Sequence, residues 1–521
     1  MKKNNLKKYA LLSVYDKTGI VALAQSIVKS GYHIISTGGT AKVLTDAHIP
    51  VIPIQIITGN PESFDGRMKT ISFQIEGGIL FDRSKKKHCR EAKKLHVPDI
   101  QMVVCNLYPF RATIQKHGVT LEEAVEQIDV GGPTMIRSAA KNFNSVLVVV
   151  DPKDYETIAN NLKKGFFTKL YRKALAAKAF RHLSFYDSQI AQYLGEDMFS
   201  NELTVPLESV QTLRYGDNPD QKASIFTIPH ETSPFRHLQK ITGRDLSATN
   251  VTDIDAGLKV VGLFDEPTVA VIKHNTPCGI ASGTTIHVAL ERALKADSES
   301  AFGGVVVLNT PMTFKAAHMI ASFKEAGKGQ MDIIAAPAFE EKAIALLSSV
   351  RKTTGLYAFG SMTNVNQHGY LIKHIIGGVV IQTANDPCSS FSEWTVVTKK
   401  KPTKKQLQQM QYAWKCIARI KSNTIIVVDK DIPMTRGIGC GQTSRVLATK
   451  IALERAGSFT KQGILASDSF FPFDDSVNFA SKAGIGAIVQ QGGSIRDADS
   501  IRAADKLGIA MVFTHQRLFW H

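Results

Sequence analysis

The sequence of 521 residues contains no apolar run near the ~20 residues that a membrane-spanning helix needs. It also lacks a signal-peptide core, because Asp16 and Lys17 end the apolar stretch that begins at Tyr9. Cysteine is scarce and scattered. The six cysteines form no CxxC pair, which argues against a disulfide framework and a structural zinc site. We therefore expect a cytoplasmic protein that spans no membrane.

Acidic residues are outnumbered by basic ones, and the formal net charge is +17. Basic runs at 85–87 and 399–405 carry part of this charge. Such a surface suits either a nucleic-acid-binding protein or an enzyme that handles small anions, although most lysines in such runs are simply solvated. No RRM, KH, zinc-finger or helix-turn-helix signature accompanies the charge. The apolar and charged fractions, 44% and 21%, are ordinary for a globular protein of several domains.

The first ~150 residues alternate between strand-like and helix-like patterns. Short apolar runs at 10–14, 32–36, 102–107 and 146–150 predict strands, and Ile20 to Val28 has a helical spacing that ends at Gly31. Alternation of this kind predicts a mostly parallel sheet with helices on both faces. The segment 154–197 is helical in pattern, and we interpret it as a connector.

A second α/β region begins near Leu203 and contains a weak internal echo. We expect 272–279 to correspond to 420–425, 300–308 to correspond to 467–473, and 332–339 to correspond to 486–494. Two related α/β lobes would explain these pairs, although short β–α units resemble one another by default. The stretch 348–405 is polar and irregular, and it predicts loops.

Four stretches of the first region have the residue types of a ligand site. The turns at 13–19 and 36–40 follow predicted strands and place glycines and hydroxyls at helix starts, where backbone N–H groups bind anions. Arg67 and Lys69 are two residues apart and so can face one ligand. Asp129 precedes a helix on which Arg137 and Lys141 share a face, so that an acid and a base converge for proton transfer. Plain β–α turns, an exposed loop and a salt-bridged surface are the corresponding structural alternatives.

The second region has two such stretches. Lys273, His274 and Asn275 follow a buried strand at 269–272. We expect Pro277 and Gly279, which come next, to interrupt regular secondary structure. A histidine at a strand end is as often structural as catalytic. The glycine-rich segment 437–445 opens a helix and resembles an anion or carbonyl cradle. It is neither a Walker A loop nor a dinucleotide fingerprint.

Taken together and in order, these stretches resemble the AICAR transformylase/IMP cyclohydrolase family. The match in the first half runs through SVYDKTG, STGGT, DGRMKT, CNLYPF and EQIDVGGPTMIRSAAKN. The match in the second half runs through LRYGDNP, IKHNTPCG, SAFGG, IKSN, GIGCGQTSR, ASDSFFPF, QGGSIRD and RLFWH. The resemblance implies an α/β fold in two parts. Residues 1–200 would form a methylglyoxal-synthase-like parallel-sheet domain with its helical connector, and residues 201–521 would form duplicated cytidine-deaminase-like α/β/α lobes.

The resemblance implies the last two steps of de novo purine biosynthesis. A formyl group passes from 10-formyltetrahydrofolate to AICAR, and the product, FAICAR, loses water as it closes to IMP. No metal is required for this chemistry. Pro277 and Cys278 match half of a deaminase zinc motif, but position 281 is alanine and no HxE precedes it. The expected partners are the ribonucleotide, the folate and a second copy in a homodimer, without nucleic acid or membrane.

The resemblance also implies roles for particular residues. In the first region the catalytic residues would be Lys69, Tyr108, Asp129 and Lys141, with Lys141 as the proton-transfer residue. The nucleotide cradle there would include Lys17, Thr37, Gly38, Gly39, Thr40, Arg67, Thr70, Cys105 and Asn106. In the second region the catalytic residues would be His274, Lys273 and Asn423. Substrate would be bound by Arg214, Tyr215, Gly303, Asp332, Arg445, Phe470, Ser494, Ile495 and Arg517.

Three segments depart from the family pattern. After Thr70 the family has two histidines, whereas this chain has Ser72 and Glu76. Asp220 replaces another histidine, and 297–299 differs as well. The first departure motivates the hypothesis that only the transformylase step survives. The charge of +17 motivates a different hypothesis, a nucleic-acid-binding protein on the same fold.

Overall fold

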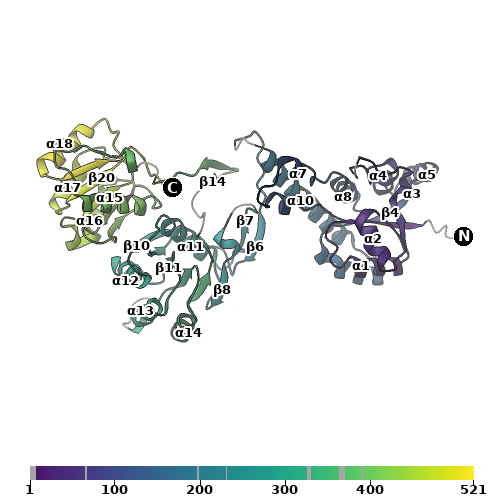
Figure 1. The fold of residues 1–521 in the computed structure, drawn as a ribbon, viewed down its shortest axis with the longest axis horizontal. Coiled ribbons are helices and arrows are strands. Elements are labelled where there is room, and N and C mark those ends of the chain that lie inside the picture. Colours follow the sequence, from purple (N-terminus) through teal and green to yellow (C-terminus); the bar gives the residue numbers. More distant parts are fainter. Residues whose placement is uncertain are drawn as a thin grey trace. The chain divides into compact units, whose positions relative to one another are not determined.

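Figure 1 shows the fold in a computed structural model of the chain. The structure describes residues 7–64, 67–195, 199–229, 232–325, 330–362, 370–388 and 391–521. The chain divides into two compact units. The N-terminal unit comprises Met1–Leu207 and Ile228–His230, and the C-terminal unit comprises Glu208–Thr227 and Glu231–His521.

The N-terminal unit is built on a five-stranded sheet. Its strands are β1 (Lys8–Val14), β2 (Tyr32–Ser36), β3 (Val51–Pro53), β4 (Asp99–Asn106) and β5 (Leu147–Val149), in the order β3-β2-β1-β4-β5. All neighbouring strands pair in parallel, which confirms the predicted parallel sheet. The four predicted strands are present. The short β3 ends in a proline and was not predicted.

Helices surround this sheet. They are α1 (Ile20–Lys29), α2 (Gly38–Asp46), α3 (Ile54–Thr58), α4 (Phe73–Leu80), α5 (Lys86–Lys94), α6 (Phe110–Ile114), α7 (Leu121–Val125), α8 (Gly131–Lys141), α9 (Tyr155–Lys164) and α10 (Lys169–Leu194). The interpretation of 154–197 as a connector is wrong for α10. Leu175, Ala179 and Leu183 of this helix are buried in the core that contains β1 and β4. An apolar face of this kind must pack on its own domain.

The C-terminal unit contains two six-stranded sheets with matching topology. The first has the order β10-β9-β11-β12-β13-β8, and the second, read from its other edge, has the order β18-β17-β19-β20-β21-β16. In each sheet the first two pairings are antiparallel, the next two are parallel, and the last is antiparallel. The predicted pair of related α/β lobes is therefore confirmed.

The strands of the first lobe are β8 (Gln239–Thr242), β9 (Thr268–Lys273), β10 (Thr276–Ser282), β11 (Val305–Leu308), β12 (Ile333–Ala336) and β13 (Gly355–Ala358). Those of the second are β16 (Thr395–Val396), β17 (Ile425–Val428), β18 (Thr435–Gly439), β19 (Ile464–Ser467), β20 (Ala487–Gln490) and β21 (Ala510–Phe513). The hairpins β6 (Glu208–Thr212) with β7 (Ser224–Thr227), and β14 (Tyr370–Ile375) with β15 (Gly378–Thr383), lie outside the two sheets.

Only one of the three expected internal correspondences is structural. Segments 332–339 and 486–494 contain the equivalent strands β12 and β20. Segment 272–279 spans the turn after β9, whereas 420–425 precedes β17, so that pair is wrong. Segment 300–308 leads into β11, whereas 467–473 follows β19, so that pair is also wrong. Short strings match by chance, whereas equivalence requires the same place in the sheet order.

The helices of the C-terminal unit are α11 (Ala248–Val261), α12 (Ile286–Ala296), α13 (Phe314–Glu325), α14 (Glu341–Val350), α15 (Lys404–Ile417), α16 (Arg445–Ala456), α17 (Asp475–Lys482) and α18 (Asp497–Leu507). One apolar cluster joins the lobes and contains Ile272 of β9, Ile426 of β17 and the fully buried Trp414 of α15. Burial of this shared surface holds the lobes together.

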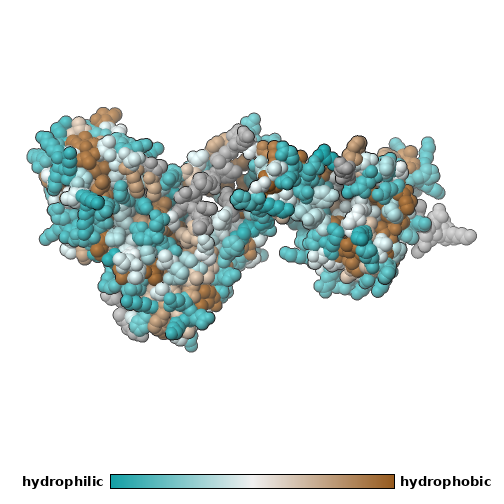
Figure 2. All heavy atoms as spheres, in the orientation of Figure 1, coloured by the Kyte–Doolittle hydropathy of each residue, from teal (hydrophilic) through white to brown (hydrophobic). Residues whose placement is uncertain are grey.

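The stretch 348–405, which was expected to hold loops, also contains β13 to β16, and β13 is part of the first sheet. Among the described residues, no helix is long and apolar enough to cross a membrane. On the face drawn in Figure 2, hydrophobic residues form small patches among hydrophilic ones. The larger apolar residues of the strands are instead buried between sheets and helices.

Candidate functional site

The N-terminal unit has a cavity of about 460 Å³ at the carboxyl ends of β1, β2 and β4. Ligands of parallel α/β sheets bind at this edge. The cavity gathers most of the residues predicted for the first region from five separate stretches of sequence. They are Lys17, Thr37, Gly38, Gly39, Thr40, Arg67, Lys69, Thr70, Asn106, Tyr108 and Asp129.

One end of this cavity suits an anion. Helix α2 begins there after Thr37, and its first backbone N–H groups have no helical carbonyl to donate to. The hydroxyl of Thr37 is buried and has no hydrogen-bond partner among the described residues. Lys17 lies beside the same turn, where a Cβ on Gly39 would come 3.5 Å from its Cε. A phosphate would satisfy all three groups.

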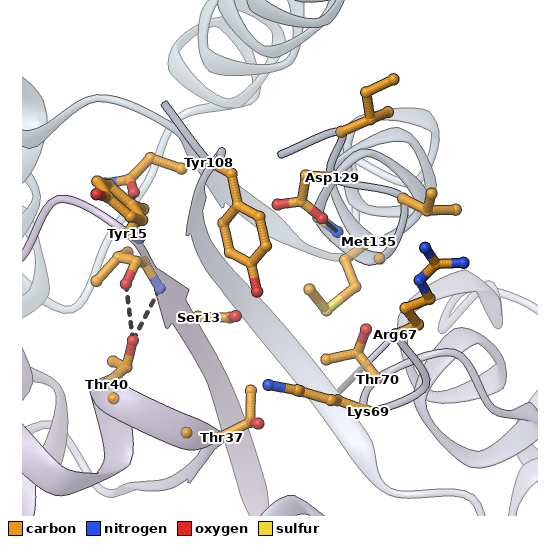
Figure 3. A pocket seen from close by; sticks show the side chains of 18 of the residues that line it. Ser13, Tyr15, Thr37, Thr40, Arg67, Lys69, Thr70, Tyr108, Asp129 and Met135 are labelled. Carbon is orange, nitrogen blue, oxygen red and sulfur yellow. Dashed lines mark hydrogen bonds between the residues drawn. The ribbon is translucent and has the colours of Figure 1, made fainter. Parts of the chain in front are cut away.

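The other end combines a carboxylate, a phenol and an amine. In Figure 3 the amine of Lys69 and the hydroxyl of Tyr108 point into the cavity, and the carboxylate of Asp129 lies beside Tyr108. Gly132 N–H donates to Asp129 Oδ1 at 2.8 Å, and the backbone N–H of Asp129 donates to the Tyr186 hydroxyl at 2.8 Å. Burial raises the pKa of the Asp129 carboxyl above its usual value. A carboxylate in this state is a suitable proton acceptor.

Two cations of the cavity are paired with carboxylates. Lys69 Nζ lies 2.6 Å from Glu62 Oε1, and Arg67 forms an ion pair with Glu126. Hydrogen bonding to Glu62 raises the pKa of the Lys69 ammonium above its usual value. Sequence reasoning missed Glu62. The Asp65-Gly66 dipeptide, a hairpin-turn signal between Glu62 and Lys69, was the available clue.

Two predicted cradle residues act through the backbone. Asn106 Oδ1 accepts hydrogen bonds from the N–H groups of Tyr15 and Asp16, at 2.6 and 2.9 Å. It thereby holds the turn that carries Lys17. Thr40 Oγ1 accepts from Val14 N–H at 3.0 Å and donates to Val14 C=O at 2.9 Å, which ties α2 to β1 (Figure 3). These contacts fix the two walls of the cavity.

Two other predictions for this site do not fit the structure. Cys105 is buried inside β4 and does not line the cavity, because its side chain points into the core. Burial also raises the pKa of its thiol well above the usual value. Lys141 lies at the opposite end of α8 from the cavity, in a shallow groove with Arg137 and Lys173. The structure therefore does not bring Lys141 to Asp129 within this chain.

The unusual segment after Thr70 keeps its helix. The hydroxyl of Ser72 caps α4 by accepting the Ile75 N–H at 3.2 Å. Glu76 Oε2 accepts a 2.5 Å hydrogen bond from the Ser138 hydroxyl of α8, and burial raises the pKa of this carboxyl. Neither Ser72 nor Glu76 lines the cavity. The two residues that depart from the family pattern, Ser72 and Glu76, therefore lie outside the lining of the cavity.

In the C-terminal unit, His274 and Asn275 form the two-residue turn between β9 and β10, where Lys273 pairs with Thr276. Both have positive φ, 54° and 61°, as a type I′ turn requires. The N–H of Asn275 donates to Asp253 Oδ1 at 2.6 Å and anchors the turn to α11. The expectation that Pro277 and Gly279 interrupt regular secondary structure is wrong. Both lie in β10, where a shift in register accommodates them.

Other predicted residues of the first lobe have contacts of their own. The amine of Lys273 donates to the Phe302 carbonyl at 2.7 Å, next to Gly303. Asp332 forms an ion pair with Arg244 at 2.9 Å. Burial raises the pKa of the Asp253 carboxyl, and the charge of Asp332 adds to this rise whereas His274 opposes it. Arg214 stacks on the Tyr215 ring at 4.5 Å and donates to the Tyr215 hydroxyl at 2.7 Å. Sequence reasoning missed Arg244 and Asp253.

Lys273 and His274 line a cavity of about 730 Å³ together with residues of the second lobe, including Gln442 and Cys440. Asn423 does not line it, but Gln442 connects the two. The backbone carbonyl of Gln442 accepts from Asn423 N–H at 3.1 Å and from Asn423 Nδ2 at 2.9 Å. His274 is therefore exposed in a cleft that is also lined by Gln442, a hydrogen-bond partner of Asn423.

Asn423 belongs to a buried polar network in the second lobe. Arg445 Nη2 donates to Asn423 Oδ1 at 2.7 Å, and Arg445 also forms an ion pair with Asp468. The side chains of Arg445 and Asp468 are 7% and 0% exposed. Asp468 Oδ2 accepts the Thr424 N–H at 3.0 Å as well as the Ser422 hydroxyl. The network fixes the Asn423 amide, and Asp468 was not found from the sequence.

The other predicted residues of the second lobe do not line the His274 cavity. They are Phe470, Ser494, Ile495 and Arg517. Ile495 is fully exposed on the loop before α18, and Arg517 stacks on Phe519. All six cysteines are free. No group of three or more metal-binding side chains was found in the described part of the chain.

Comparison with known proteins agrees with this architecture. The model of the AICARFT/IMPCHase bienzyme family matches residues 139–455, and that of the MGS-like domain matches residues 19–134. The bifunctional purine biosynthesis protein PurH of Acetivibrio thermocellus is 44% identical over 520 residues, covering 99% of this chain and 100% of that protein. PurH of Leuconostoc mesenteroides is 42% identical over 515 residues, 98% of this chain and 99% of that protein. The chain belongs to the AICARFT/IMPCHase bienzyme family, whose members join an AICAR transformylase to an IMP cyclohydrolase in purine biosynthesis.

Proposed function

We propose that ring closure takes place in the cavity of the N-terminal unit. One observation supports this proposal: a single cavity has an anion cradle at one end and proton-transfer groups at the other. The cradle consists of Lys17 and Thr37, and the proton-transfer groups are Asp129, Tyr108 and Lys69. The phosphate of the ribonucleotide would bind the start of α2. Arg67 and Thr70 would border the base.

The closure needs little more than orientation and proton movement, because both reacting groups belong to one molecule. The carboxamide nitrogen attacks the formyl carbon, and a C–N bond forms. Asp129 takes the proton that leaves the nitrogen, and its raised pKa suits this step. The ammonium of Lys69 stabilises the oxyanion and protonates it to a hydroxyl, to which Tyr108 donates a hydrogen bond. Asp129 then gives its proton to this hydroxyl, which leaves as water while the formylated nitrogen loses its N–H proton to solvent and the C=N bond forms. Lys69 regains a proton from solvent.

Formyl transfer is assigned to the first-lobe group around the β9–β10 turn. The amine of AICAR attacks the formyl carbon of 10-formyltetrahydrofolate, His274 takes the amine proton, and N10 of the folate leaves with a proton. Imidazole exchanges protons near neutral pH, which suits this step. Lys273 would stabilise the developing oxyanion, and the amide of Asn423, fixed by Arg445, would orient the formyl group. No metal is needed in either step.

The remaining predicted substrate contacts belong to this second proposal. Arg214, Tyr215, Gly303 and Asp332 would hold the ribonucleotide on the first lobe, and Phe470, Ser494, Ile495 and Arg517 would contact substrate on the second. Because Ile495 is fully exposed and lies outside the His274 cavity, we propose that the chain acts as a homodimer. The exposed apolar residues Ile375, Ile376 and Val379 on the β14–β15 hairpin favour the same assembly.

A coupled assay tests both halves. AICAR and 10-formyltetrahydrofolate are supplied to the full chain, both products are followed, and FAICAR is then supplied directly. The proposal expects IMP in both experiments. Formation of FAICAR without ring closure would favour the transformylase-only alternative, but Ser72 and Glu76 lie away from the cavity and argue against it. We propose a cytoplasmic enzyme without a nucleic-acid partner. Tight RNA binding with a steep salt dependence would contradict this.

A further inference from the structure

The ion pair between Glu62 and Lys69 is set by backbone pairing. Ser63 and Met68 form an antiparallel bridge, and the N–H of each donates to the carbonyl of the other at 3.3 Å. Glu62 and Lys69 are the next opposite positions of this ladder, where side chains lie on one face. The N–H of Arg67 also donates to the Phe64 carbonyl at 3.0 Å and closes the turn. The carboxylate is therefore held against the amine by the chain itself.

Glu62 differs from the other groups around Lys69 because it does not line the cavity. Its contact with Lys69 is 2.6 Å long, and the side chains are 39% and 27% exposed. The charged or titratable groups that line the cavity with Lys69 are Tyr15, Lys17, Arg67, Tyr108, Glu126 and Asp129. Of these, Glu126 is already paired with Arg67. Glu62 thus supports Lys69 from behind, on the side away from a bound substrate.

This geometry determines what Lys69 can do. Partial burial by itself would make the Lys69 amine lose its proton more readily than an exposed lysine does, since desolvation disfavours the charged form. A carboxylate at hydrogen-bonding distance offsets that effect and also restricts the long lysine side chain to one direction. The ammonium then remains a donor, which the departing oxygen of the ring-closure step requires.

We propose that Glu62 is a positioning residue for ring closure, which holds Lys69 as an ammonium aimed into the cavity of the N-terminal unit. The inference rests on the proposed use of that cavity. It goes beyond it by assigning a role to a residue that never touches the substrate. It also makes Lys69 a proton donor rather than the base.

The test uses Glu62→Gln in the full chain, with FAICAR supplied directly. We expect kcat for ring closure to fall about tenfold, less than the 10²–10⁴-fold typical of removing an acid or base itself. KM should change less than about threefold, since ground-state binding is unaffected. The alkaline limb of the pH–kcat profile should move to lower pH, because Lys69 loses its proton sooner without the carboxylate. Glu62→Asp keeps the charge, and its profile should lie between those of Glu62→Gln and the unaltered chain.

Controls separate this role from a structural one. Formyl transfer measured on the same preparation reports folding and should be unchanged. Glu91→Gln removes the carboxylate of an exposed pair with Lys87 on α5, 3.9 Å apart, and should leave ring closure unchanged. An unchanged kcat and alkaline limb in Glu62→Gln would overturn the inference. So would an effect on KM alone.

A second variant distinguishes failure of the inference from failure of the proposed function. If Lys69→Ala abolishes ring closure while Glu62→Gln is fully active, the cavity assignment stands and only the role of Glu62 is lost. If Lys69→Ala is also fully active, the cavity is not where the ring closes, and both proposals fail.

Discussion

Glu76 of α4 is joined to Ser138 of α8 by a 2.5 Å hydrogen bond, in which the serine hydroxyl donates to Oε2. The other carboxylate oxygen, Oε1, is buried and has no partner among the described residues. The start of the same helix α8 forms a wall of the N-terminal cavity. A partly buried carboxyl therefore lies behind the proposed ring-closure site, against the helix that forms one wall of the cavity.

This contact predicts how stability depends on pH. Burial raises the pKa of Glu76, so the folded chain holds the proton more tightly than the unfolded chain. The protonated form is favoured on folding, and stability from this group falls as pH rises from the ordinary carboxyl pKa through the raised one. Glu76→Gln should raise the free energy of unfolding by about 1 kcal/mol at pH 8 and by less at pH 5. Urea unfolding at both pH values measures this, and equal effects would contradict it.

The glycines at the start of α8 predict a second outcome. A Cβ on Gly132 would lie 2.6 Å from Asp129 Oδ2 and 2.8 Å from Leu107 Cδ2. Gly132→Ala should therefore displace the Asp129 carboxylate and lower ring-closure kcat by about 100-fold. Formyl transfer by the same variant should be unaffected. Full ring-closure activity would show that Asp129 is not held in place by this close approach.

Lys141 provides a third test. It lies at the far end of α8 and outside the cavity, so Lys141→Ala should keep ring-closure activity within about threefold. Lys173→Ala, in the same groove, is the matched control. A loss as large as that of Lys69→Ala would instead support the role implied by the family resemblance. It would then require Lys141 to reach the site from a second copy of the chain.

The buried network of the second lobe predicts a fourth outcome. Asp468 forms an ion pair with Arg445, and Arg445 fixes the Asn423 amide. Asp468→Asn leaves a buried guanidinium without its counter-charge, which costs about 3 kcal/mol of stability. Formyl transfer should fall because Asn423 is no longer held, while ring closure at a temperature below unfolding should be unchanged. Denaturant unfolding and the two assays measure these effects, and unchanged formyl transfer would contradict the role given to Asn423.

The sequence predicted elements whose signals are local. Strand Tyr32–Ser36 was found with its observed bounds, because an apolar run lies between Gly31 and Gly38. Duplication of the lobes was also expected, although two of the three supporting correspondences were wrong. Their letters matched, whereas their places in the sheet order did not. Pro277 and Gly279 were expected to interrupt regular secondary structure. The strand β10 instead runs through both residues, because a shift in register accommodates them.

The turns at 13–19 and 36–40 were predicted because they follow strands that end at one sheet edge. Most other residues of the first candidate site were predicted from the family resemblance. The contacts that support it were not predicted. Glu62 meets Lys69 beside the Ser63–Met68 bridge, Ser138 donates to a carboxylate 62 positions away, and Asp468, just after β19, reaches Arg445 at the start of α16. Such partners depend on register and tertiary packing. Lys141 is the opposite case. Helical spacing predicts the helix face on which it lies, but not which end of α8 lines the cavity.

The central claim is that the two reactions use separate sets of residues, one in each unit. Measuring both activities on His274→Ala and Lys69→Ala, with FAICAR supplied directly for ring closure, tests this most directly. We expect His274→Ala to lose formyl transfer about 100-fold and to keep ring closure, and Lys69→Ala to show the reverse. Loss of both activities in either well-folded variant, or loss of neither, would contradict the account.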